Sequence, residues 1–175
     1  MAQGDVDIWL SFALQQIAAE SYLDGIDLSN PQQVIGQLQL GNNNVTGDDP
    51  TASVLPGKIR MTRLQAEQFV QRYQVVDHHA NDATGFSATV LFDTETNSYT
   101  LSFRSSEYAI DNNGGDRSRD ILGADAEIKS SGFAFAQLVS MTRYFEDLQQ
   151  GKKSDGTVDP SLAAFFGNSQ NQLNV

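Results

Sequence analysis

The sequence has no cysteine and few basic residues, and each shortage excludes certain classes of protein. Without cysteine, the 175-residue chain has no disulfide scaffold, no cysteine-ligated zinc, no iron–sulfur cluster and no thiol nucleophile. It has 11 Lys and Arg residues against 22 Asp and Glu residues, and a formal net charge of −11. Nucleic acid is therefore not an expected partner, because phosphate backbones attract clustered Lys and Arg. The same shortage argues against a polybasic face that binds anionic membranes.

The sequence also lacks a long hydrophobic run. Its first five residues include no Lys or Arg, whereas a signal peptide begins with a basic segment. The most apolar N-terminal stretch, residues 8–23, is interrupted by Gln15, Gln16 and Glu20, so no transmembrane segment is expected. If the protein is exported, the signal lies elsewhere or has been removed. The length fits about one domain that is large enough to bury a core.

Three stretches in the first 73 residues carry helix signals. Asn30 before Pro31 is typical of a cap and first turn, and predicts a helix to about residue 40. Thr62 and Gln65 have the spacing of a capping box that opens a helix through residue 73, with Leu64, Phe69 and Val70 as core contacts. Residues 6–23 form an amphipathic pattern whose expected core face contains Ile8, Trp9, Phe12, Ala13, Ile17, Ala19 and Leu23.

The clearest local pattern in the sequence is a β-hairpin. Residues 86, 88, 90 and 92 are apolar at a period of two, and residues 99, 101 and 103 repeat the pattern. A polar segment, residues 93–98, separates the two runs. This arrangement predicts two antiparallel strands joined by a turn.

The second half of the chain continues with helices and loops. We expect a polar loop over residues 105–116, a short helix over 119–127, a loop over 151–156 and a brief helix from Asp159-Pro160 to Phe166. A strand is expected to begin at 173–175. A long helix is expected over residues 132–148, between the short helix and the loop 151–156. Its expected core face contains Ala134, Phe135, Leu138, Val139, Met141, Phe145 and Leu148.

This order of elements predicts an α/β fold with two regions. Residues 1–84 are expected to be helical, and residues 85–175 to form part of a sheet domain. A parallel strand normally follows a crossover helix, so the sheet as read from these residues is incomplete.

The two histidines, His78 and His79, are adjacent. Neighbouring side chains point in different directions on regular structure, so the two are poor co-ligands and a poor acid–base pair. A surface or capping role is the expected one. The sequence contains no G-x-S-x-G, P-loop or G-x-G-x-x-G motif, which argues against a self-contained hydrolase site built on His78.

Two acidic loops have oxygen ligands but not the spacing of a known calcium site. Residues 111–116 combine Asp, Asn and Gly, which suits Ca²⁺ in principle. They lack the pattern of an EF-hand, as do residues 152–159. Solvated turns are the expected structure of both loops, and no metal or other cofactor is assigned.

Residues 85–148 resemble bacterial lipases of the class 3, fungal-lipase-like, α/β-hydrolase group. The resemblance rests on an ordered set of segments: 85–90, 99–107, 120–125 and 131–133. In that family, a strand ends in Arg-Gly-Thr or Arg-Gly-Ser, and a long helix follows after an interval. The resemblance implies an incomplete α/β-hydrolase-like fold in which N-terminal helices precede a β-hairpin and a long crossover helix.

The resemblance also implies roles for four residues. Ser106 stands at the position that supplies an oxyanion-hole donor in the family, and Arg104, Ser105 and Asp120 would support that turn. Ser105 departs from the family pattern, which has glycine there. Residues 173–175 resemble the start of the strand that carries the nucleophile, so the Ser–His–Asp triad would lie beyond residue 175.

Two principal hypotheses follow. The first is the N-terminal part of a secreted lipase or esterase that acts on lipid or other ester substrates, with the oxyanion turn present and the triad absent. The second is a non-catalytic acidic binding or structural module, with calcium at residues 111–116. In either case an open sheet edge makes a homodimer plausible.

Overall fold

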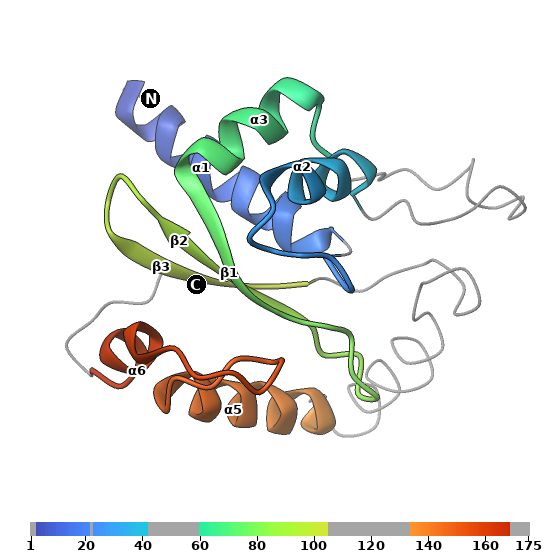
Figure 1. Ribbon diagram of the computed structural model, residues 1–175, viewed down its shortest axis with the longest axis vertical. Helices are drawn as coiled ribbons and strands as arrows, with labels where there is room; N and C mark the ends of the chain where they lie inside the picture. Colours follow the sequence, from blue (N-terminus) through green and yellow to red (C-terminus); the bar gives the residue numbers. More distant parts are fainter. Residues whose placement is uncertain (1–2, 22, 42–59, 105–133, 169–175) are drawn as a thin grey trace, which may run out of the picture.

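A three-stranded antiparallel sheet lies between two layers of helices (Figure 1). The computed structural model describes residues 3–21, 23–41, 60–104 and 134–168. Helices α1, α2 and α3 cover one face of the sheet, and α5 and α6 cover the other. The elements are α1 (Gln3–Glu20), α2 (Pro31–Leu40), α3 (Arg63–Arg72), β1 (Tyr73–His79), β2 (Ala88–Asp93), β3 (Ser98–Phe103), α5 (Phe135–Gln149) and α6 (Pro160–Phe166).

The strand order is β1-β2-β3, and both pairings are antiparallel. The predicted hairpin is confirmed as β2 and β3, joined by a turn in which Asn97 has φ 54 and donates its backbone N–H to Asp93 O at 2.8 Å. Asparagine tolerates this left-handed conformation better than most residues do. The described residues therefore have a mixed α/β architecture, and the expected parallel strand is not among them.

Three of the predicted helix starts are confirmed by their caps, those of α2, α3 and α6. The side chain of Asn30 accepts from the backbone N–H groups of Gln32 and Gln33, with Pro31 in the first turn of α2. Thr62 and Gln65 form the reciprocal bonds of a capping box at α3. At α6, the side chain of Asp159 accepts from the backbone N–H of Ser161. Each side chain satisfies a backbone donor that the helix itself leaves free.

The two faces of the sheet have separate hydrophobic clusters. The first joins α1, α2, α3, β1 and β2, and includes the fully buried Leu38, Phe69 and Leu91. The second joins β2, β3, α5 and α6. Its buried members are Phe86, Ala88, Val90, Leu101, Tyr144, Leu148, Leu162 and Phe166.

The expected core face of the first helix is wrong in its N-terminal half. Ile8, Trp9 and Phe12 are 56 %, 66 % and 41 % exposed, whereas Ala18 and Ala19 are fully buried. The helix ends at Glu20 rather than at residue 23, and in its C-terminal half Gln16 Nε2 donates to Phe103 O of β3. Helical spacing predicts a common face, but it does not predict how much of that face a neighbour covers.

Two further core assignments need correction. Leu64 on α3 is 65 % exposed, whereas Phe69 is buried as expected. On α5, the buried residues are Tyr144 and Leu148, and the expected core residues Phe135, Leu138 and Val139 are exposed. The apolar surface of α5 is broader than the part that meets the sheet.

Strand β1 was not expected from the sequence. It falls within residues 1–84, for which the sequence pattern predicts helices, and pairs along its length with β2. The division of the chain at residue 84 remains a prediction. The expected short helix at 119–127 and the strand at 173–175 lie outside the described residues.

Candidate functional site

The carboxyl end of β3 lies at the same end of the sheet as the two histidines. The register sets His79 opposite Ala88 and Ala88 opposite Phe103, so the three residues lie side by side on neighbouring strands. Arg104 follows directly, and its backbone N–H donates to Ser87 O at 3.1 Å. The other predicted site residues, Ser105, Ser106 and Asp120, and the acidic loop 111–116 lie outside the described residues.

A bulge in β1 determines which way its polar side chains point. The register shifts between Val75 and Asp77, so Val76 is an extra residue relative to β2. Val75 belongs to the cluster under α1–α3, whereas Val76 packs against the cluster under α5. Asp77 also contacts α5, so two successive residues face the same side. The usual alternation of a strand is thereby displaced by one residue.

His78 is buried on the α1–α3 side, so the expected surface or capping role is wrong for it. Its Nδ1 lies 2.9 Å from Thr89 Oγ1, and its Nε2 lies 3.3 Å from Asp24 Oδ1. The contact with His78 lowers the pKa of Asp24, and the positive charge of Arg104 contributes in the same direction. Arg104, at the end of β3, therefore favours the ionised form of Asp24.

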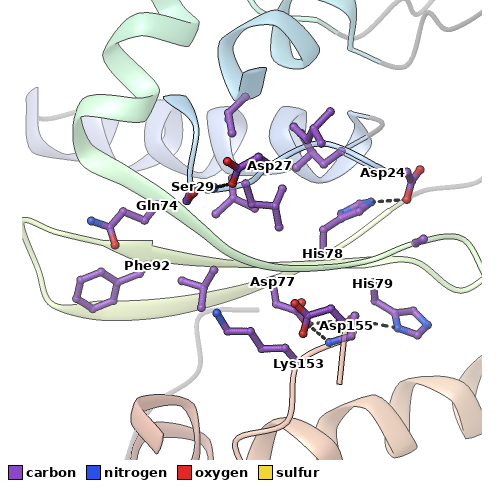
Figure 2. A pocket seen from close by; sticks show the side chains of 18 of the residues that line it. Asp24, Asp27, Ser29, Gln74, Asp77, His78, His79, Phe92, Lys153 and Asp155 are labelled. Atoms are coloured by element: carbon purple, nitrogen blue, oxygen red, sulfur yellow. Dashed lines mark hydrogen bonds and ion pairs between the residues drawn. The ribbon is translucent and has the colours of Figure 1, made fainter. Parts of the chain in front are cut away.

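His79 points to the opposite face, as expected for adjacent residues on a strand (Figure 2). Its ring lies 4.9 Å from the ring of Tyr144 and 5.2 Å from that of Phe86. Its Nε2 is 3.8 Å from Asp82 Oδ2, and its Nδ1 is 3.5 Å from Ser154 Oγ. The ring therefore has aromatic neighbours beside its faces and edges and polar neighbours at its two nitrogen atoms.

Asp77 connects β1 to α5 and to the loop after α5. Its Oδ2 accepts from Tyr144 Oη at 2.9 Å, from Ser154 N at 3.0 Å and from Ser154 Oγ at 2.8 Å. The carboxylate belongs to a residue that is only 4 % exposed. Burial raises the pKa of Tyr144 well above its usual range, and the charge of Asp77 raises it further. The tyrosine therefore remains a neutral hydrogen-bond donor to the carboxylate.

Ser154, His79 and Asp82 resemble a hydrolytic triad in composition but not in geometry. The hydroxyl proton of Ser154 is donated to Asp77, and the separation of 3.5 Å from His79 is at the limit of a hydrogen bond. A serine is activated when its hydroxyl donates to a base that takes up the proton. The arrangement therefore ties the loop to β1 and does not support the hypothesis of a self-contained hydrolase.

A groove of about 1220 Å³ runs along the outer edge of β1. Its floor is residues 73–82, one wall is residues 23–29, and the other includes residues 153–155 (Figure 2). The described residues that line it include six aspartates and one lysine, Lys153, whose Nζ is 3.6 Å from Asp159 Oδ2. The groove is therefore strongly negative. The aspartates are Asp24, Asp27, Asp77, Asp82, Asp155 and Asp159.

Several of these residues were not singled out from the sequence. Asp24, Tyr144 and Ser154 come from three distant segments, and their pattern along the chain carries no sign of a common site. Tyr73, Val75 and Val76 favour a strand by type, and that preference was the available signal for β1.

Metal ligation and membrane insertion have no support within the described ranges. Across residues 3–21, 23–41, 60–104 and 134–168, no group of three or more His, Cys, Asp or Glu side chains is arranged to hold a metal ion. In the same ranges, every helix is too short or too polar to cross a bilayer.

No family model matches the chain, and comparison with curated proteins and with solved structures finds no match either.

Proposed function

We propose that this chain is the N-terminal part of a secreted lipase or esterase. The enzyme would hydrolyse carboxylic esters with a Ser–His–Asp triad outside these 175 residues. The observation that carries the proposal is the position of Arg104, directly after the second strand of an antiparallel hairpin and before Ser105 and Ser106. The resemblance to class 3 lipases assigns the oxyanion turn to these residues.

The surroundings of Arg104 support a positioning role for it. Its backbone is fixed to the sheet by the bond to Ser87, and its charge favours the ionised form of Asp24. Asp24 in turn contacts the buried His78. A turn that begins from such a fixed point can present a donor in a constant direction. Donors that are held in place before the reaction stabilise a developing oxyanion more than mobile ones do.

The proposal is tested by hydrolysis of p-nitrophenyl esters. The 175-residue chain should be inactive, and the product of the complete gene should be active. Activity in the short chain would contradict the assignment of the triad to another segment. Inactivity of the complete product on short and long acyl chains would contradict the proposal itself.

The role of Ser106 is tested in the active protein. Removal of one oxyanion donor costs about 3 kcal/mol in comparable sites, so Ser106→Ala should lower kcat about 100-fold and change KM much less. Ser98→Ala, at the first residue of β3, is the matched control and should leave both constants unchanged. An unchanged kcat in Ser106→Ala would refute the role of the hydroxyl.

A further inference from the structure

The outer edge of β1 is open along the groove. Within the part of the chain that the structure describes, β2 is the one strand that pairs with β1. The edge of a sheet presents backbone N–H and C=O groups that another extended chain can pair with. Residues 73–82 line the groove, so the seven residues of β1 form its floor.

The walls of the groove limit what can approach this edge. Residues 23–29 rise on one side of β1 and residues 153–155 on the other, as Figure 2 shows through Asp24, Asp27, Lys153 and Asp155. A single extended segment can lie between these walls. A second copy of this chain would bring its own two walls to the same edge, so a single extended segment is the simpler occupant.

The charge of the walls defines the chemistry of the segment. Asp27 and Asp155 lie on opposite walls and are exposed, and hydrogen bonds from Ser29 and Thr157 lower their pKa values. Both are therefore ionised at neutral pH. Successive side chains of a strand point to opposite faces, so two adjacent basic residues would reach one wall each. Two copies of the same acidic groove would instead repel each other.

We propose that this groove binds an extended, basic peptide segment of another protein, which pairs with β1 as a fourth strand. Backbone hydrogen bonds to β1 supply the affinity, and the aspartates of the two walls select Lys or Arg at adjacent positions. This inference depends on the edge of β1 and its walls, and not on the proposed ester hydrolysis. A negative result for either proposal would therefore leave the other unaffected.

The test uses the full chain and a fluorescein-labelled peptide, Thr-Val-Lys-Lys-Val-Thr-Val, whose seven residues match the length of β1. Fluorescence anisotropy should show saturable binding that weakens with added salt. Two peptides serve as controls. One has Glu-Glu in place of Lys-Lys, and the other has N-methyl groups on alternate backbone nitrogens, so that it keeps its charge but cannot pair. Both should bind at least about tenfold more weakly.

Variants of the protein test whether the peptide binds in the groove. The double variant Asp27→Asn/Asp155→Asn should bind the lysine peptide about fivefold more weakly or worse. The matched control is Glu95→Gln/Glu146→Gln, which changes the net charge equally at exposed positions away from the groove, and it should bind as the wild type does. Amide exchange should slow at residues 73–80 when the peptide binds.

Three results would overturn the proposal. Equal binding of the N-methylated peptide would show attraction to an acidic surface without strand pairing. Equal loss of affinity in both double variants would show a general effect of charge. Concentration-dependent dimerisation that protects β1 without any peptide would assign the edge to a second copy of the chain.

Discussion

The contact between Tyr144 and Asp77 should stabilise the protein by an amount that depends on both partners. Tyr144→Phe removes one of three hydrogen bonds to Asp77 Oδ2 and leaves the two from Ser154. Hydrogen bonds to charged groups contribute about 1.5–3 kcal/mol, so the free energy of unfolding should fall by about 2 kcal/mol. In an Asp77→Ala background the tyrosine hydroxyl has lost this acceptor, and the same substitution should cost about 0 kcal/mol or stabilise slightly.

The assay is a double-mutant cycle measured by urea denaturation with circular dichroism. The interaction energy should be about 2 kcal/mol. If Asp77→Ala is too unstable, Asp77→Asn gives a smaller but still positive interaction energy, because a neutral acceptor binds the donor less strongly.

Burial raises the pKa of Tyr144, so unfolding releases its proton above about pH 10. The wild type should then lose stability with rising pH, and its advantage over Tyr144→Phe should shrink. Equal costs of Tyr144→Phe in both backgrounds would refute this reasoning.

Two further predictions test the sheet and the loop after α5. Burial opposes ionisation of Asp93, but hydrogen bonds from Arg72 at 2.7–3.2 Å outweigh it and lower the pKa. Asp93→Asn should therefore cost about 1.5–3 kcal/mol at neutral pH, and thermal melts should show the difference disappearing below about pH 4; a constant difference would contradict the linkage. Gly151 has φ +76, and an added Cβ would lie 2.6 Å from Asp159 O, whereas Gly156 has φ +82 and open space around it. Gly156→Ala should cost about 1–2 kcal/mol for its backbone conformation alone, and Gly151→Ala clearly more; equal melting temperatures would contradict this.

The sequence predicted those elements whose signals are local. The alternation of residues 86–92 and 99–103 identified the hairpin, and the Asn30 and Thr62 caps identified two helix starts, because each signal lies within a few residues of its effect. The stripe on α1 had the correct period, yet Trp9 is exposed, because coverage depends on where the sheet ends.

Strand β1 and its polar contacts could not be predicted in the same way. Asp77 and His78 are polar residues in a region that was expected to be helical, and they are buried because partners from residues 24, 144 and 154 satisfy them. The bulge at Val76 also reverses the faces that simple alternation would assign to Asp77 and His78. Neither the partners nor the bulge has a signature in the local sequence. The oxyanion turn remains a prediction, since Ser105 and Ser106 lie outside the described residues.

The two hydrophobic clusters become complete at different moments of protein synthesis. The buried members of the first lie between Ala18 and Leu91, whereas the second requires residues as late as Phe166. Because chains emerge from the ribosome with the N-terminus first, the helices α1–α3 can pack on β1 and β2 before α5 is translated. Ala88 and Val90 on the other side of β2 would then be uncovered for several seconds at ordinary elongation rates. The nascent chain would be prone to aggregation during that interval. A chaperone that shields this uncovered sheet face would therefore have its largest effect before α5 is translated.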